Sequence, residues 1–233
     1  MSVLVARLLT IRQQLGIELE RFWLLWRYQH QVPPFTLWWR LVLKRIADFI
    51  SAAIGIALFA PVLLLIALAV KLTSRGPIFY SQERVGRFGE AFKIYKFRTM
   101  RVNAEANGPV WASPERDPRV TPIGNFLRKT HLDELPQLFN VLKGDMSLVG
   151  PRPERPCFVE ALDRAIPRYD QRLLIKPGMT GLAQVHYRYD QSIEDVKRKL
   201  RFDLLYVRRM CLMLDAKILA WTFLVVLTGR GIR

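Results

Sequence analysis

Two adjacent carboxylates, Asp133 and Glu134, have the residue types and spacing best suited to chemistry in this sequence. Arg128 precedes them, and Arg152 follows them between two prolines. A positioned carboxylate can act as a nucleophile, a general base or a metal ligand. Prolines on both sides restrict the backbone of an arginine, and a guanidinium group held in this way suits bidentate binding of a phosphate. The combination predicts a site for phosphoryl chemistry.

The same residues also have a purely structural interpretation. Aspartate is a preferred N-cap and glutamate is common in the first helical turn, so both acids could simply cap a helix. Residues 143–153, which contain the second arginine, could likewise form a rigid surface turn. A helix is indeed predicted after the acids, because apolar residues recur over 135–142 and Gly144 would stop it. Asp133 and Glu134 would then lie at or beside its N-terminus, where unsatisfied N–H groups favour negative charge.

An uncharged apolar run over residues 49–70 is the strongest membrane signal, because it is long enough to cross a bilayer. Basic residues flank it on both sides: Lys44, Arg45, Lys71 and Arg75. Positive charge at both ends suits a helix whose ends both stay on the cytoplasmic face. Pro61 would kink the helix, so that it enters and leaves the same leaflet. One straight spanning helix is the alternative, because transmembrane helices tolerate proline.

Amphipathic or apolar helices are predicted at both ends of the chain. Residues 3–27 have apolar side chains at helical spacing, interleaved with arginines, and are expected to lie at the membrane surface; a helix packed on a soluble core is the alternative. Residues 194–210 form a basic amphipathic pattern that we expect to lie on lipid. Residues 218–227 are apolar but too short to span a bilayer, which predicts an interfacial or core helix.

The middle of the chain predicts a hairpin and one more helix. Residues 78–80 and 92–97 are rich in aromatic and β-branched residues and flank the turn-like segment 86–89, which predicts a β-hairpin. Thr121 followed by Pro122 can open a short helix. Neither the Gly-x-Gly-x-x-Gly fingerprint nor a phosphate loop is present in the sequence, so a Rossmann or Walker mechanism is not expected.

The composition points to an anionic membrane surface. The formal net charge is +16, whereas 51% of the residues are hydrophobic and six are tryptophan. A nucleic-acid-binding domain rarely combines such charge with positive mean hydropathy, so we expect anionic membrane lipids, and no nucleic acid, as partners. Two unpaired cysteines and three scattered histidines predict neither a disulfide framework nor a zinc site. Charged residues interrupt the N-terminal apolar pattern, so it lacks the uninterrupted apolar core of a signal peptide. The chain is therefore expected to stay on the cytoplasmic side.

Several long motifs in register resemble one family. They are Lys44-Arg45, 82–86 (QERVG), 93–100 (KIYKFRTM), 133–138 (DELPQL), 143–153 (KGDMSLVGPRP) and 176–181 (KPGMTG). Together they resemble the monotopic phosphoglycosyl transferases, bacterial sugar transferases that start surface glycan assembly on undecaprenyl phosphate. The resemblance extends from about Lys44 to Gly231.

The resemblance and the patterns together imply an organisation. We expect a mainly α fold with a small β-hairpin: a monotopic membrane protein with a Pro-kinked re-entrant helix, amphipathic interfacial helices and a compact cytoplasmic catalytic domain. The expected units are a membrane-surface extension (1–43), the re-entrant helix (44–73) and the catalytic domain with interfacial C-terminal helices (74–233). The expected location is the bacterial inner membrane, with the catalytic domain on the cytoplasmic face. The oligomeric state stays open, a homo-oligomer included.

The resemblance also implies roles for individual residues. Asp133 resembles the family nucleophile, which attacks the β-phosphate of a UDP-sugar, releases UMP and carries the phosphosugar. Glu134 resembles its partner when undecaprenyl phosphate attacks that intermediate. The remaining implied site residues bind substrate or phosphate: Arg128, Arg152, Lys96 and Asp203. Magnesium is the implied cofactor, with Asp133 near it.

Some alternatives remain open. Direct transfer in a ternary complex would need a carboxylate only as base or metal ligand. A non-catalytic membrane-surface scaffold or nucleic-acid binder would have no need of the acids and arginines together. The family usually has Ser-Pro at the membrane kink, whereas this chain has Ala60-Pro61, so the kink would depend on Pro61 and nearby charges. The sugar and the glycan pathway are not revealed, although residues 176–190, including Gln184, His186 and Arg188, could select the sugar or form a structural loop.

Overall fold

The computed structural model describes residues 16, 18–29, 33–105, 108, 117–187 and 192–228. Its helices are α2 (Pro34–Thr73), α3 (Pro122–Thr130), α4 (Gln137–Lys143), α5 (Pro156–Ala165), α6 (Leu182–His186), α7 (Ile193–Arg209) and α8 (Leu212–Thr228). Its strands are β1 (Phe79–Val85), β2 (Ala91–Phe97), β3 (Ser147–Val149) and β4 (Gly178–Thr180). Three 3-10 segments are η1 (Arg87–Gly89), η2 (Leu132–Glu134) and η3 (Tyr169–Leu174). The expectation of a mainly helical fold with a small hairpin is confirmed.

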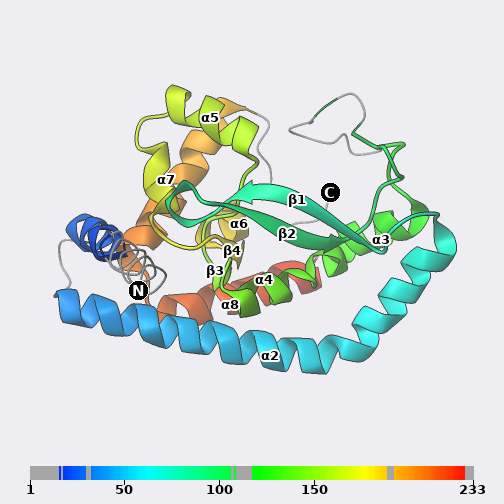
Figure 1. Cartoon of the computed structure of the whole chain (residues 1–233), viewed down its shortest axis with the longest axis horizontal. Coiled ribbons are helices and arrows are strands. Elements are labelled where there is room, and N and C mark those ends of the chain that lie inside the picture. Colours follow the sequence, from blue (N-terminus) through cyan, green and yellow to red (C-terminus); the bar gives the residue numbers. More distant parts are fainter. Residues whose placement is uncertain are drawn as a thin grey trace, which may run out of the picture.

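The long helix α2 forms the base of the molecule. It runs beneath the other elements and then changes direction in its later part (Figure 1). Pro61 is the proline inside this helix, and a proline there removes one backbone hydrogen bond and crowds the preceding turn, which accounts for a bend. The helix starts at Pro34, inside the segment that we expected to be a separate extension. Of that extension, residues 18–28 are helical, and residues 1–15 lie outside the described residues.

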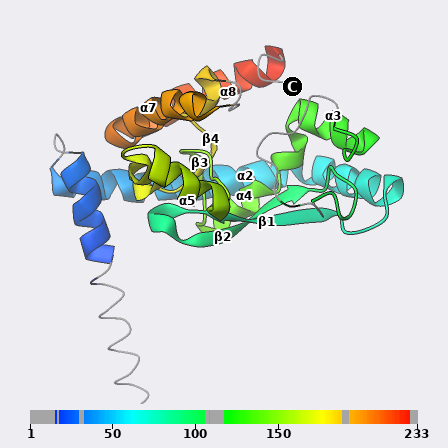
Figure 2. The same ribbon diagram turned by 90° about the horizontal axis from the view of Figure 1, so that it is seen from above.

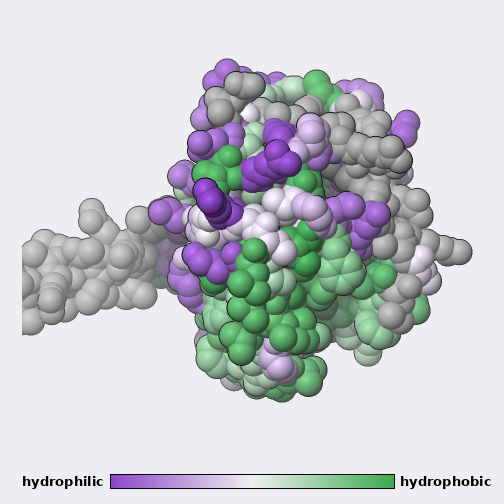
Figure 3. All heavy atoms as spheres, turned by 90° about the vertical axis from the view of Figure 1, so that its right-hand side faces the viewer, coloured by the Kyte–Doolittle hydropathy of each residue, from purple (hydrophilic) through white to green (hydrophobic). Residues whose placement is uncertain are grey.

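The outer side of α2 is apolar and exposed. The helix is long and apolar enough to cross a membrane, and only 11% of its most apolar window is buried. Its most exposed side chains include Leu58, Leu64 and Leu72. Hydrophobic side chains gather on the lower part of the face toward which α2 bends, below a hydrophilic upper part (Figure 3). An exposed apolar surface of this extent is typical of membrane association.

The predicted hairpin is confirmed. Strands β1 and β2 pair antiparallel, with Phe79 opposite Phe97 at one end and Val85 opposite Ala91 at the other. A two-stranded sheet is marginally stable alone, and this one is held against α4 by the buried Asn140. Its Oδ1 accepts from the Tyr95 amide at 3.0 Å, and its Nδ2 donates to the Lys93 carbonyl at 2.7 Å. The hairpin and the helix that follows the two acids therefore form one unit.

The predicted start of the helix after Thr121 and the predicted stop at Gly144 are confirmed, whereas α4 begins at Gln137, two residues later than the apolar pattern indicated. Thr121 caps α3 by accepting a hydrogen bond from the Gly124 amide at 3.0 Å. His131, in the left-handed conformation, ends α3 and leads into η2, which contains both acids. Pro136 directly precedes α4, and Gly144 ends it with a φ of 94° that favours glycine. These local signals fix where the acids sit in the chain.

A second, parallel sheet joins two segments far apart in the sequence. Strand β3 pairs with β4, which places residues 143–153 beside residues 176–181. The backbones approach closely: a Cβ atom on Gly150 would lie 2.5 Å from the Lys176 carbonyl oxygen, and one on Gly178 would lie 2.1 Å from the Gly150 nitrogen. Glycine is required at both positions, and the pairing orients the loop that carries Arg152.

Helices α7 and α8 lie on one side of α2, and the hairpin lies on the other (Figure 2). The apolar residues of α7 pack into the protein interior, where Val196, Leu200 and Val207 are buried. Our expectation that this helix presents an apolar face to lipid is therefore corrected: the apolar stripe forms core. In α8 only part of the surface is covered, because Ile218 is buried while Phe223 is 63% exposed.

Candidate active site

Three predicted site residues meet at the Glu134 carboxylate. Lys96, on β2, places its Nζ 2.6 Å from Glu134 Oε1. Arg152, in the loop after β3, donates from Nη2 to Oε1 at 2.7 Å and from Nη1 to Oε2 at 3.4 Å. The Arg152 side chain is still 43% exposed, so it can also bind an incoming anion. The fold therefore brings the predicted acid, lysine and arginine into one site.

The electrostatics of Glu134 keep it ionised. Burial opposes its charge, but Arg152 and then Lys96 outweigh burial and hold the pKa of Glu134 well below its usual value. The carboxylate in turn raises the pKa of the Arg152 guanidinium. Glu134 is thus an anion that contacts two cations, Lys96 and Arg152.

Asp133 has a different environment from its neighbour. Its side chain is buried, and burial raises its pKa; Lys96 lowers it, and the adjacent Glu134 raises it further. Within the described residues no ion pair is formed by the Asp133 carboxylate. Two titratable groups whose environments push their pKa values apart often have separate roles in catalysis. Here Glu134 is engaged by cations, whereas Asp133 keeps its oxygens available.

Arg128 completes the cationic surroundings. Its Nε donates to Thr99 Oγ1 at 3.0 Å, which orients the side chain from α3 toward the end of β2. It lies near enough to Asp133 to lower the pKa of that carboxyl group. Lys96, Arg128 and Arg152 are therefore grouped around the two acids, as a site for a negatively charged phosphate requires.

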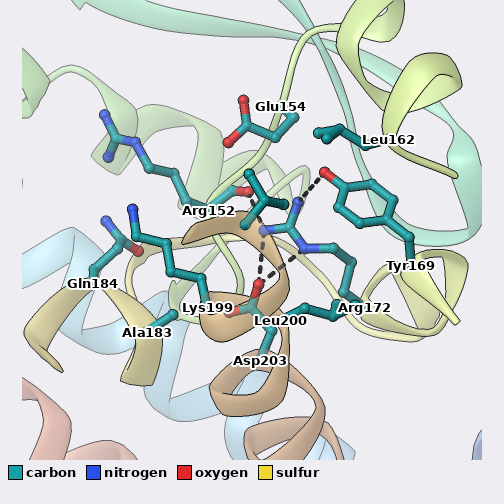
Figure 4. A pocket seen from close by; sticks show the side chains of 11 residues that line it. Arg152, Glu154, Leu162, Tyr169, Arg172, Ala183, Gln184, Lys199, Leu200 and Asp203 are labelled. Atoms are coloured by element: carbon teal, nitrogen blue, oxygen red, sulfur yellow. Dashed lines mark hydrogen bonds and ion pairs between the residues drawn. The ribbon is translucent and has the colours of Figure 1, made fainter. Parts of the chain in front are cut away.

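A buried cluster of side chains contacts the backbone of Arg152. Arg172 donates from Nη2 to the Arg152 carbonyl oxygen at 2.9 Å, from Nε to Asp203 Oδ2 at 2.9 Å and from Nη1 to the Tyr169 hydroxyl at 3.0 Å. We call Arg172, Tyr169 and Asp203 the Arg172 cluster (Figure 4). All three are buried, and the predicted site residue Asp203 contacts Arg172 rather than the two acids. The cluster positions the backbone of Arg152.

The sequence alone did not single out Arg172. Two of its three partners, Arg152 and Asp203, lie 20 and 31 residues away along the chain, on a loop and on α7, so no local pattern marks it. A basic residue shortly before the Lys176-Pro177-Gly178 motif was the one available signal.

Both flanks of the apolar run in α2 are tied to the catalytic elements. Arg45 donates to the carbonyl oxygens of Val141 and Leu142 at 2.6 and 2.7 Å, which satisfies the C-terminal end of α4. At the other end of α2, Arg98 donates to the carbonyl oxygens of Ser74 and Arg75, each at 2.9 Å. Lys44 also faces inward and binds Asp215 of α8 at 2.7 Å. Lys44 and Arg45, which the sequence showed only as basic residues flanking the apolar run, thus contact the catalytic unit.

The described residues contain no group of three or more His, Cys, Asp or Glu side chains that could hold a metal ion. Of the two acids at the site, Glu134 is already bound by two cations, so Asp133 is the side chain able to contact a metal. Magnesium commonly binds through one or two carboxylates, with substrate phosphates and water as its other ligands. The donor set fits a magnesium ion that arrives with a phosphorylated substrate.

The sequence is similar to those of several proteins of stated name. The chain is 46% identical over 191 residues to UDP-N-acetylgalactosamine-undecaprenyl-phosphate N-acetylgalactosaminephosphotransferase of Aeromonas hydrophila, covering 82% of this chain and 45% of that protein. It is 44% identical over 190 residues to UDP-glucose:undecaprenyl-phosphate glucose-1-phosphate transferase of Escherichia coli (strain K12), covering 81% and 40%. It is 40% identical over 201 residues to exopolysaccharide production protein PSS of Rhizobium leguminosarum bv. phaseoli, covering 82% and 98%.

The chain thus spans less than half the length of the Aeromonas and Escherichia relatives and nearly all of the Rhizobium one. Residues 39–229 match the bacterial sugar transferase family, a range that includes α2, both acids and their cations. The chain belongs to the bacterial sugar transferase family.

Proposed function

We propose that this protein transfers a sugar 1-phosphate from a UDP-sugar to undecaprenyl phosphate, with Asp133 as the nucleophile. The observation that carries the proposal is the contrast within the acid pair: Glu134 binds Lys96 and Arg152, while Asp133 forms no ion pair within the described residues. The names of the relatives, which act on UDP-sugars and undecaprenyl phosphate, support the substrates. The Rhizobium relative supports a role in starting exopolysaccharide-type glycan assembly.

The proposed reaction has two displacements. In the first, a carboxylate oxygen of Asp133 attacks the β-phosphorus of the UDP-sugar, and the bond to the oxygen bridging the two phosphates breaks, so UMP leaves. In the second, a phosphate oxygen of undecaprenyl phosphate attacks the phosphorus held on Asp133, which restores the carboxylate and forms the lipid diphosphate sugar. Covalent catalysis of this kind divides one transfer into two easier steps.

The cations of the site reduce the electrostatic repulsion between the attacking carboxylate and the phosphate. A carboxylate that approaches a phosphate meets like charge, and preorganised cations lower that cost. Glu134 fixes Lys96 and Arg152 beside the reacting phosphate, and Arg128 adds a third positive charge. Magnesium, when bound through Asp133 and phosphate oxygens, would supply further neutralisation of the diphosphate.

Isotope exchange tests the covalent route. The purified protein is incubated with a UDP-sugar and labelled UMP in the absence of lipid, and label in the UDP-sugar is measured. We expect exchange with the native protein and none with Asp133→Asn. Direct transfer in a ternary complex predicts no exchange without the lipid acceptor, so its absence with a donor that supports transfer would refute the proposed intermediate.

We also propose that α2 enters and leaves the cytoplasmic leaflet of the inner membrane. The apolar run over residues 49–70 would be about 33 Å long as a straight helix, about the thickness of the hydrocarbon core. A helix that crossed would separate its ends by the bilayer, yet Arg45 and Arg98 join the two ends to the same catalytic unit. The bend of α2 brings this about (Figure 1).

Thiol labelling tests this topology. In a background with both native cysteines changed to serine, Phe35→Cys and Pro77→Cys place single thiols beyond the two ends of the apolar run; both positions are exposed. We expect neither thiol to react with a membrane-impermeant reagent in intact cells, and both to react after lysis. Reaction of one thiol in intact cells would show a spanning helix.

A further inference from the structure

An open cleft begins at the side chain of Arg152 and runs between α6 and α7. The buried Arg172 cluster borders it, and polar side chains of Glu154, Gln184 and Lys199 also line it (Figure 4). Arg152, Gln184 and Lys199 extend to the same side of this view, while the Glu154 carboxylate lies apart from them. Because Arg152 also binds Glu134 at 2.7 Å, this one residue belongs both to the cleft and to the site of the two acids.

The polar groups of the cleft suit a ligand rich in hydroxyl groups. Gln184 donates from Nε2 to the Met179 carbonyl at 3.2 Å, which fixes its amide, and its buried Oε1 has no hydrogen-bond partner among the described residues. A buried acceptor without a partner is unfavourable, and a hydroxyl donor would satisfy it. Lys199 adds an ammonium group, which is a hydrogen-bond donor, and Glu154 adds a carboxylate acceptor.

The geometry of phosphoryl transfer decides which part of the donor reaches this cleft. The attacking and leaving oxygens lie in line, so UMP departs on the side opposite Asp133. The sugar occupies an equatorial position of the β-phosphate, beside the oxygens that Arg152 is placed to bind. A sugar attached there would extend along Arg152 and into the cleft.

We propose that the cleft binds the sugar ring of the nucleotide-sugar donor, and that Gln184 and Lys199 determine which sugar is accepted. This inference rests on the proposed phosphoglycosyl transfer. Other parts of the substrates fit the cleft less well. Tyr169 is 1% exposed, so it offers no ring face for stacking a uracil base. The charged groups of Arg152, Glu154 and Lys199 do not suit a polyprenyl chain, which has the exposed apolar surface of α2 available to it.

A donor panel tests the proposal with variants outside the acid pair and its cations. The probes are UDP-glucose, UDP-galactose and their two N-acetylated counterparts, and UMP release gives kcat/KM for each. For each variant, Gln184→Ala and Lys199→Gln, we compare kcat/KM for the donor that the native protein prefers with kcat/KM for each other donor. We expect at least one of these ratios to fall about tenfold, because a site that binds a hydroxyl group discriminates between sugars through that hydrogen bond. Lys197→Gln, the same substitution on an exposed position of α7 paired with Glu194, should leave the ratios unchanged.

Calorimetry separates sugar recognition from nucleotide recognition. The affinity of Gln184→Ala and Lys199→Gln for the best UDP-sugar should fall several-fold, while their affinity for UDP alone should stay within about twofold of native. Equal losses for UDP and UDP-sugar would show that the cleft holds the nucleotide, and equal changes for all donors would also overturn the proposal. Failure of the native protein to release UMP from any donor would refute the proposed function instead, and the calorimetric comparison would still test the cleft.

Discussion

Replacing Glu134 with glutamine removes the charge that two cations share at the centre of the site. Lys96 Nζ at 2.6 Å and Arg152 Nη2 at 2.7 Å both donate to the same oxygen, Oε1. A hydrogen bond to a charged group contributes about 1.5–3 kcal/mol, and the amide oxygen of glutamine would retain part of this. We expect a loss of about 3 kcal/mol in transition-state stabilisation, which corresponds to a fall in kcat/KM of about 100-fold.

The same change should move the acid limb of the pH profile. Asp133 must be ionised to attack phosphorus, so the rate falls as the pH drops below the pKa of Asp133. Burial raises this pKa, Lys96 lowers it, and the charge of Glu134 raises it. Glutamine removes the contribution of Glu134, while Lys96, Arg128 and Arg152 still lower the pKa of Asp133. The pKa of Asp133 therefore falls, and the acid limb shifts to lower pH although the enzyme is slower.

Initial rates of UMP release across acid to neutral pH measure both effects. Glu160→Gln, which removes the same charge from an exposed position on α5, is the matched control and should change neither the rate nor the profile. An acid limb that stayed in place or moved to higher pH would refute the assignment of Asp133 as the group that must ionise. Full activity of Glu134→Gln would refute the role of Glu134 in orienting the cations.

Three further substitutions test the support of the site, each measured as the free energy of unfolding of the detergent-solubilised protein. Asp203→Asn should cost about 3 kcal/mol, because it leaves the buried Arg172 guanidinium without its counter-ion, whereas the exposed Asp163→Asn should be neutral. Gly150→Ala should cost about 1–3 kcal/mol or more, because its Cβ would lie 2.5 Å from a carbonyl oxygen, and Gly16→Ala, with nothing within 4 Å, should cost nothing. Arg45→Met should cost about 1–3 kcal/mol, because the Leu142 carbonyl loses its side-chain donor and the Val141 carbonyl keeps only the Gly144 amide. A neutral result for any of the three would show that the contact does not contribute to stability.

Local signals in the sequence predicted the elements that carry the acids. Thr121 before Pro122 and Gly144 after an apolar run mark the ends of two helices, because capping depends on a residue and its immediate neighbours. The hairpin was predictable for the same reason, since its strands are adjacent in the chain. Pairing between β3 and β4 was not predicted, because strands of three residues separated by a long connection leave no periodic pattern.

The amphipathic pattern of α7 shows the limit of such signals. Periodicity established that one face is apolar, but what covers that face is a property of the tertiary fold, and here it is the protein core rather than lipid. The same holds for the cations. The charges of Lys44 and Arg45 were evident from the sequence, whereas their contacts with α8 and α4 depend on how the first part of α2 packs beneath the catalytic unit.

The sequence by itself determined the acid pair, the arginine between two prolines, the apolar run with its proline, and the family that they resemble. Only the tertiary structure decided that Glu134 is engaged by Lys96 and Arg152 while Asp133 keeps its oxygens available, and that Arg172 and Asp203 support the loop from behind. The physical reason is that residue type and local spacing specify which groups can ionise. Their burial and the cations brought next to them from distant segments specify which oxygen is left to react.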